Sequence, residues 1–287
     1  MKDISRPNGL PFMKMHGLGN DFVVIDRRGQ DHSVTPALAR ALGDRHRGVG
    51  FDQLAVIDDD SSADDPADVA LTFYNADGSL SAACGNATRC IARHEMIRTG
   101  TAALTLRSER GVLQAEDAGN GLTRINMGAP LLDWQEIPLA QPMDTLHLPI
   151  DGDPVATGMG NPHCTFFVAD AEAVALTTLG PLYEHHPLYP QRTNVEFVQI
   201  LSPSAIRLKI WERGTGVTLA SGSCSCAAAV ASARRGLTGR QVAVHVDGGI
   251  LQIDWRSDGV WMTGPTMHAF NGTLTAQFLA SLTEQTA

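Results

Sequence analysis

Cys84 and Ser221 are each followed by a glycine at a point where a strand and a loop should give way to a helix. The flanking residues read ACGN at positions 83–86 and ASGS at positions 220–223. The first backbone N–H groups of a helix have no partner inside it, so they can bind an anion, and glycine lets the anion approach closely. The positive end of the helix dipole also favours the thiolate form of a cysteine. We therefore predict that Cys84 is a reactive thiolate at a site that binds a carboxylate.

Close helix packing is the alternative explanation for small residues at these positions. The polar, turn-rich stretch YNADGS before Cys84 favours a ligand site over packing there. The alanine-rich run at residues 227–233 is instead predicted to be core. Cys90 and Cys226 are likewise predicted to be buried small hydrophobic residues.

Side chains that could bind an amino acid lie at the ends of several strand-like runs. A single amide is an ordinary turn or cap residue, but together they could bind a carboxylate with Arg213, while Glu212 binds an ammonium group. His163, in the sequence GNPHC, could lie beside the reacting centre. The amides are Asn20, Gln53, Asn75, Asn161 and Asn194.

The chain repeats itself with a nearly constant offset. GLGN at residues 17–20 returns as GMGN at residues 158–161, a shift of 141, and Gln53 and Asn194 are also 141 apart. Cys84 and Ser221 are 137 apart, and each lies nine residues after a polar residue, Asn75 or Glu212. Four matches in the same order predict two similar halves.

Each half has the same predicted elements. Runs rich in β-branched and aromatic residues, such as FVVID and VALTFYN in the first half and NVEFVQI and AIRLKIW in the second, are typical of strands. One helix should follow Cys84 and stop at Gly100, and another should follow Ser221 and stop at Gly236. We predict an α+β fold of two pseudo-symmetric domains, residues 1–131 and 132–287, each mostly antiparallel around one central helix.

Composition excludes several classes of function. A net charge of −9 without a basic cluster argues against binding to nucleic acid, and no apolar run is long enough to cross a membrane. The N-terminus lacks the apolar segment of a signal peptide, and five unevenly spaced cysteines fit neither a disulfide framework nor a zinc site.

We predict a reduced, cytoplasmic chain, with no metal or cofactor and a small amino acid as its ligand. None of the three lysines has the context expected of a Schiff base with pyridoxal phosphate.

Several motifs together resemble the diaminopimelate epimerases, which interconvert LL- and meso-diaminopimelate without a cofactor. The motifs are HGLGNDF, DRHRGVGFDQL, YNADGS, ACGN, GNPH, RTNVEF and WERGTGVTLASG, and the resemblance runs to about Trp261. It implies two domains, each a barrel-like antiparallel sheet around a central helix, with the active site in the cleft between them. It also implies that the last residues could return to the first domain and that the chain could form a homodimer.

The resemblance also implies roles for individual residues. In this family one cysteine removes the α-proton as a thiolate, and a second cysteine on the opposite face delivers a proton as a thiol. Cys84 matches the first, Gly85–Asn86 and Gly222–Ser223 match the helix starts that hold the carboxylate, and His163 and Glu212 match polar residues beside the cysteines. The family's substrate-binding positions are matched by Asn20, Gln53, Asn75, Asn161, Asn194, Glu212 and Arg213.

Ser221 departs from the pattern, because it stands where the second cysteine belongs, and Cys224 stands where a small residue is usual. A hydroxyl is a poorer acid than a thiol. The chain could be an ordinary epimerase with a sporadic or engineered substitution, or a slow enzyme that pairs a thiol with a hydroxyl. It could instead be a racemase or lyase for another amino acid, or a binding protein that has lost catalysis. Cys224, one helical turn after Ser221, could approach the same face, but it is expected to serve packing.

Overall fold

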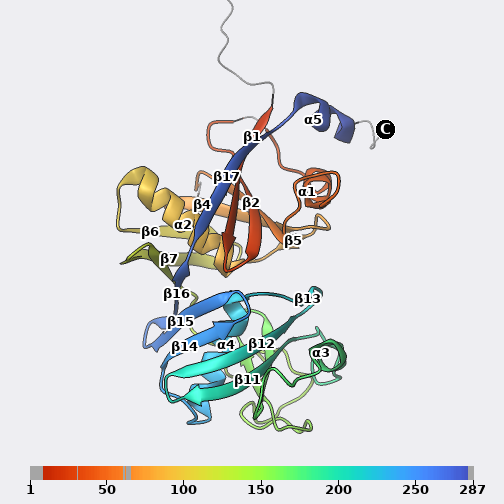
Figure 1. The fold of residues 1–287 in the computed structure, drawn as a ribbon, viewed down its shortest axis with the longest axis vertical. Helices are drawn as coiled ribbons and strands as arrows, with labels where there is room; N and C mark the ends of the chain where they lie inside the picture. The colour runs from red at the N-terminus through yellow and green to blue at the C-terminus, as the bar shows by residue number, and fades with distance from the viewer. Residues whose placement is uncertain (1–8, 31, 61, 63–65, 284–287) are drawn as a thin grey trace, which may run out of the picture. The chain divides into compact units, whose positions relative to one another are not determined.

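The computed structural model describes residues 9–30, 32–60, 62 and 66–283, and its contacts divide the chain into two compact units (Figure 1). The first unit holds the described residues up to Gly17, Asp21–Gln114, and the described residues from Thr266 onward. The second holds Leu18–Asn20 and Ala115–Pro265. This division follows Gln114, whereas the sequence-based boundary follows residue 131. The N-terminus, for which no signal peptide is predicted, lies outside the described residues.

Helix α2, Gly85–Thr99, is the main helix of the first unit, and it packs against strands β1 and β6. Gly100 ends it in the left-handed conformation at φ 72°, as the sequence predicts. The remaining elements of this unit are β1 (Leu10–Gly17), most of β2 (Asn20–Asp26), α1 (Pro36–Gly43), β3 (Gln53–Asp58), β4 (Val69–Asn75), β5 (Leu80–Ser81), β6 (Ala103–Ser108), the start of β7 (Gly111–Gly119), β17 (Met267–Leu274) and α5 (Ala276–Thr283).

Helix α4, Gly222–Arg234, is the central helix of the second unit. It contacts strands β9, β10, β11, β12, β14, β15 and β16, and nearly all of its side chains are buried. A helix enclosed on all sides needs small residues, which explains the run of alanines. The other elements are β8 (Leu122–Asn126), β9 (Val155–Gly158), β10 (Pro162–Phe167), α3 (Leu176–Glu184), β11 (Asn194–Ser202), β12 (Ala205–Glu212), β13 (Gly216–Val217), β14 (Gln241–Val246), β15 (Gly249–Arg256) and β16 (Gly259–Pro265).

The strand topology repeats between the units and confirms the internal repeat. In the first unit β2 runs parallel to β3, β3 antiparallel to β4, and β4 parallel to β6 beyond helix α2. In the second unit β10, β11, β12 and β14 have the same relations around helix α4. The register repeats as well: Phe22 lies opposite Gln53, and His163 lies opposite Asn194, both shifted by 141. The remaining pairs are mostly antiparallel, so the predicted α+β class with two pseudo-symmetric domains is correct.

Each unit has its own hydrophobic core. In the first, Val23 and Leu54 on the parallel strands pack with Leu42 of helix α1. In the second, Phe166 stacks on Phe197 with ring centroids 5.2 Å apart. Among the described residues, no helix is both long enough and apolar enough to cross a membrane.

Candidate active site

Cys84 is the N-cap residue of helix α2, with an extended backbone at φ −143° and ψ 102°. The amide of Ala87 donates a hydrogen bond to its Sγ at 3.5 Å, and the Thr88 hydroxyl donates to its carbonyl oxygen at 2.8 Å. Cys84 is partly exposed, unlike the other four cysteines, which are buried. Gly85 and Asn86 form the first turn, where the backbone N–H groups have no carbonyl partner within the helix.

Ser221 has the equivalent position at the start of helix α4, with φ −136° and ψ 125°. The Ser225 hydroxyl donates to the Ser221 carbonyl oxygen at 2.8 Å, which repeats the bond between Thr88 and Cys84. One difference separates the two caps. The Ser221 side chain makes no capping hydrogen bond to the helix, whereas the Cys84 sulfur does.

Two of the predicted amides, Gln53 and Asn75, are connected by hydrogen bonds through Ser81 to the residue before Cys84. Gln53 Nε2 donates to Asn75 Oδ1 at 3.3 Å and to Ser81 Oγ at 3.0 Å. Ser81 in turn donates to the carbonyl oxygen of Ala83, the residue before Cys84, at 3.2 Å. Gln53 and Asn75 are therefore held beside the start of helix α2.

A second group of predicted residues gathers at the start of helix α4. Asn161 Nδ2 donates to Ser223 Oγ at 3.4 Å, and Asn161 Oδ1 lies 2.9 Å from His163 Nε2. Ser223 follows Gly222 in the first turn of the helix. Asn161 and His163 therefore lie next to Ser221 and its helix start.

Asn194 holds the backbone of Arg213 in place, because its Oδ1 accepts a hydrogen bond from the Arg213 amide at 3.0 Å. Arg213 follows Glu212, the last residue of strand β12. Burial lowers the pKa of the Arg213 guanidinium, and repulsion from Arg192 acts in the same direction. A partly desolvated guanidinium of this kind would be stabilised by an anionic ligand.

Asn20 follows a turn in which Leu18 and Gly19 both have positive φ, 57° and 86°. A Cβ on Gly19 would come within 2.7 Å of the Leu219 side chain, so this turn packs against the segment just before Ser221. Asn20 accordingly belongs to the second unit with the group around Ser221. The predicted residues thus form two groups, one in each unit.

Two residues near these groups, Arg89 and Glu196, escaped the sequence analysis. Arg89 is fully buried in helix α2 and donates to Asn86 Oδ1 at 2.8 Å, which adds positive charge near the helix start. Glu196 is fully buried, and its carboxylate lies within 4.8 Å of the sulfur of the buried Cys224. The signal for Glu196 was an acidic residue inside the apolar strand NVEFVQI, since a buried carboxylate needs compensating partners.

Cys90, Cys164 and Cys226 are buried, as the sequence predicts for Cys90 and Cys226. Burial raises the pKa of the Cys90 thiol to about 11. Burial also raises the pKa of Cys164 well above that of a free thiol. Cys226 is buried in the middle of helix α4.

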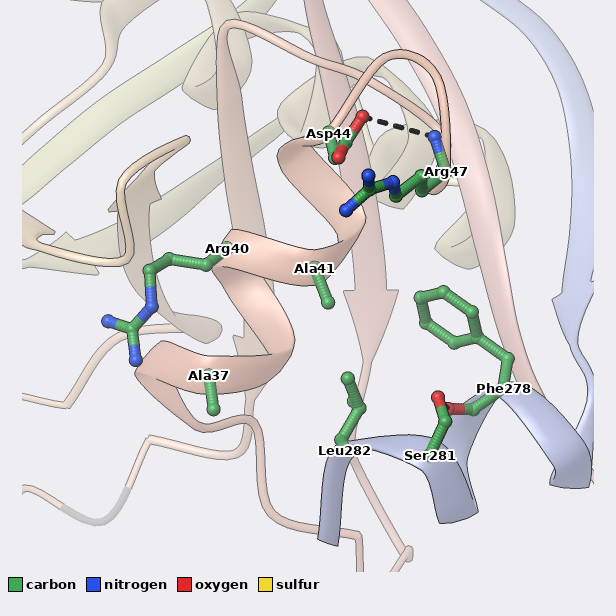
Figure 2. Close-up of a pocket in the computed structure, with 8 residues that line it drawn as sticks. All are labelled: Ala37, Arg40, Ala41, Asp44, Arg47, Phe278, Ser281 and Leu282. Carbon is green, nitrogen blue, oxygen red and sulfur yellow. Dashed lines mark hydrogen bonds between the residues drawn. The ribbon is translucent and has the colours of Figure 1, made fainter. Parts of the chain in front are cut away.

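A separate pocket of about 440 Å³ lies between helices α1 and α5 of the first unit (Figure 2). Figure 2 shows Arg40 and Arg47 on the α1 side and Phe278 and Leu282 on the α5 side. None of the predicted site residues lines it. The pocket is therefore distinct from both groups.

Comparison with known proteins identifies the family. A sequence model described as diaminopimelate epimerase matches residues 12–132 and 155–269. The chain belongs to the diaminopimelate epimerase family. It is 50% identical over 273 residues to the diaminopimelate epimerase of Rhodospirillum centenum. The matched region covers 93% of this chain and 93% of that relative. It is 49% identical to that of Acidiphilium cryptum, over 94% of this chain and 98% of the relative.

Solved structures share the fold of the family at low sequence identity. A hydroxyproline epimerase from Agrobacterium vitis with bound trans-4-hydroxy-L-proline has a TM-score of 0.67 and 14% identity, and covers 93% of this chain and 92% of its own. A predicted epimerase from Pseudomonas aeruginosa has a TM-score of 0.66 and 16% identity, and covers 92% and 99%. These likenesses establish the two-domain fold alone.

Proposed function

We propose that the chain is an isomerase that interconverts LL- and meso-2,6-diaminopimelate by removing and returning the α-proton without a cofactor. Membership of the diaminopimelate epimerase family, at up to 50% identity over nearly the whole chain, carries this proposal. The hydrogen-bonded groups around Cys84 and Ser221 support it. This reaction serves the biosynthesis of lysine and peptidoglycan precursors.

Cys84 and Ser221 are proposed to act on opposite faces of the α-carbon. Cys84, as a thiolate, removes the proton from one isomer, and Ser221 exchanges the proton on the other face. The N–H groups of Gly85–Asn86 and Gly222–Ser223 would hold the α-carboxylate, whose charge they stabilise as the carbanion forms. His163 and Glu212 would tune the polarity around the reacting atoms.

The remaining polar residues are proposed to bind the rest of the substrate. Arg213 supplies a charge-assisted hydrogen bond to a carboxylate, and its partly desolvated state supports this role. The amides of Asn20, Gln53, Asn75, Asn161 and Asn194 would complete the polar lining.

A panel of amino acids tests the proposed substrate against a racemase for another amino acid. The purified chain is incubated with LL-diaminopimelate, L-proline and trans-4-hydroxy-L-proline, and the stereoisomers are separated by chiral chromatography. We expect only diaminopimelate to change configuration. Turnover of proline or hydroxyproline without turnover of diaminopimelate would refute the proposal.

We further propose that the enzyme works in the cytoplasm as a homodimer. The homodimer is tested by light scattering coupled to size-exclusion chromatography. A mass of one chain of 30.6 kDa would contradict it.

A further inference from the structure

A chain of hydrogen bonds leads from the buried residue Glu196 to the start of helix α4. Glu196 Oε1 lies 2.6 Å from His163 Nδ1, and His163 Nε2 lies 2.9 Å from Asn161 Oδ1. Asn161 Nδ2 in turn donates to Ser223 Oγ at 3.4 Å, in the first turn of the helix. Glu196 and His163 are 0% exposed. Asn161 and Ser223 are partly exposed, so this end of the chain is open to a ligand.

Strands β10 and β11 position the buried end of the chain. His163 and Thr165 lie two residues apart on β10 and therefore point to the same face of the sheet. Glu196 on β11 lies opposite Thr165, whose hydroxyl donates to Glu196 Oε2 at 3.1 Å. Helix α4 packs against both strands, and its Cys224 sulfur lies within 4.8 Å of the ligand atoms of His163 and Glu196. Both carboxylate oxygens of Glu196 are therefore bonded inside the protein.

The buried carboxylate of Glu196 requires a compensating positive charge. Thr165 supplies a hydrogen-bond donor but no charge. An imidazolium at His163 supplies the charge, and its two N–H groups match the oxygens of Glu196 and Asn161 that face the ring. The distance of 2.6 Å between His163 Nδ1 and Glu196 Oε1 is short, as charge-assisted hydrogen bonds are. Two ligands of a tetrahedral zinc ion would lie about 3.3 Å or more from each other.

The protonation of His163 determines the orientation of the Asn161 amide. A protonated Nε2 can only donate, so the amide oxygen of Asn161 faces the ring and the amide nitrogen faces helix α4. A neutral ring would keep its single proton on Nδ1, beside Glu196. Its bare Nε2 would then accept a hydrogen bond from the amide nitrogen of Asn161. The amide oxygen would face the helix start instead, where it would repel a carboxylate.

The first unit shows that the fold does not require this ion pair. With the shift of 141, His163 corresponds to Phe22 and Glu196 to Ala55, and both of these residues are buried and apolar. A buried ion pair is often no more stabilising than apolar residues of similar volume. The orientation of Asn161 is therefore a better reason for the pair than stability.

We propose that Glu196 is a positioning residue that acts through His163. Paired with the imidazolium of His163, it holds the amide nitrogen of Asn161 towards a substrate carboxylate at the start of helix α4. This inference rests on the proposed epimerase function. Glu196 neither touches the substrate nor exchanges a proton with it. Its contribution is to binding, and it acts equally on the ground state and the transition state.

The positioning role is tested by the initial rates of epimerisation by Glu196→Gln, measured from LL- and from meso-diaminopimelate. Glutamine keeps the shape of the side chain and removes its charge. KM should therefore rise about tenfold or more, the size of one lost hydrogen bond to a charged group, while kcat changes less than about threefold. The control Ser232→Ala, which removes a buried hydroxyl further along helix α4, should change neither constant. A fall in kcat with an unchanged KM would overturn the proposal.

A double variant separates positioning from general damage to the fold. If Glu196 acts through Asn161, the amide must be present for Glu196→Gln to weaken binding. In the Asn161→Ala background, Glu196→Gln should raise KM by less than about twofold. The same rise in this background as in the wild-type chain would show that Glu196 acts by another route and would overturn the proposal.

The protonation of His163 is measured without turnover. Nitrogen-15 NMR of the ring, assigned with His163→Gln, should show a proton on both nitrogens at pH 7 in the wild-type chain and on only one nitrogen in Glu196→Gln. A bare ring nitrogen in the wild-type chain, or an unchanged ring in Glu196→Gln, would overturn the proposal whether or not diaminopimelate is the substrate. A doubly protonated ring without turnover of diaminopimelate would instead refute the proposed function and support the ion pair.

Discussion

Replacing Glu95 by glutamine should loosen helix α2, which carries Cys84 at its start, and the effect should depend on pH. Glu95 is 1% exposed. It accepts two hydrogen bonds of 2.9 Å from Arg28 and one of 2.7 Å from Arg98. Burial alone would raise the pKa of Glu95, but the two guanidinium groups outweigh burial and lower its pKa to about 2.

The size of the effect follows from this pKa. The difference between 4.5 in the unfolded chain and about 2 in the folded chain corresponds to about 3 kcal/mol of stability at pH 7. Arg98 is 51% exposed and screened by solvent, so we expect about 2 kcal/mol. Because the folded pKa is lowered, this contribution is complete above about pH 4.5 and is lost as the pH falls towards 2.

Hydrogen exchange of the α2 amides, followed by mass spectrometry, is the suitable assay. Tryptophan fluorescence would not report on this helix, because all four tryptophans lie in the second unit. Glu95→Gln should speed this exchange about 30-fold at pH 7, and by a clearly smaller factor at pH 3. The control Asp58→Asn breaks the more exposed ion pair with Arg27 and should cost less than about 1 kcal/mol. An equal effect of Glu95→Gln at both pH values would refute the reasoning.

Two further predictions concern the second unit. Gly180→Ala should lower its stability by about 1–3 kcal/mol in urea unfolding followed by tryptophan fluorescence, because the new Cβ would lie 2.4 Å from the Trp211 ring. Gly239→Ala, whose Cβ would meet nothing closer than 3.8 Å, is the control, and equal losses would contradict the packing argument. Arg213→Ala should weaken diaminopimelate binding in calorimetry by at least about 30-fold, since a lost charged partner costs about 2–5 kcal/mol. Lys209→Ala should not weaken binding, because Lys209 pairs with Asp247. Equal affinities of the two variants for diaminopimelate would contradict the assignment of Arg213 to the site.

The sequence was sufficient to predict the features that depend on local patterns. Glycine at the end of helix α2 and the apolar alternation of the strands are local signals. The repeat of 141 and 137 residues located the two helix starts and most of their polar neighbours. Helix α1 was not predicted, although the sequence contains signals for its start. Thr35 caps the helix, and Pro36 is its first residue.

Other features depend on which segments meet in space. Helix α3 has no side-chain cap and contains Pro181, so its sequence lacks the usual helix signals. Strand β17 pairs with β1 from the opposite end of the chain, and no local pattern encodes that pairing. The partners of Cys224 were hidden for the same reason: Glu196 reaches it only because β11 packs against helix α4. The sequence favoured packing for Cys224 and did not reveal that its sulfur lies within 4.8 Å of the buried side chains of His163 and Glu196.

Proton NMR of LL-diaminopimelate in D₂O, with the wild-type chain and with Cys84→Ala, tests the central claim most directly. We expect the wild-type chain to produce the meso isomer with deuterium at the inverted α-carbon, and Cys84→Ala to stop this interconversion. An α-proton that stays in place with the wild-type chain would contradict the epimerase function. Interconversion at an undiminished rate by Cys84→Ala would contradict the role of Cys84.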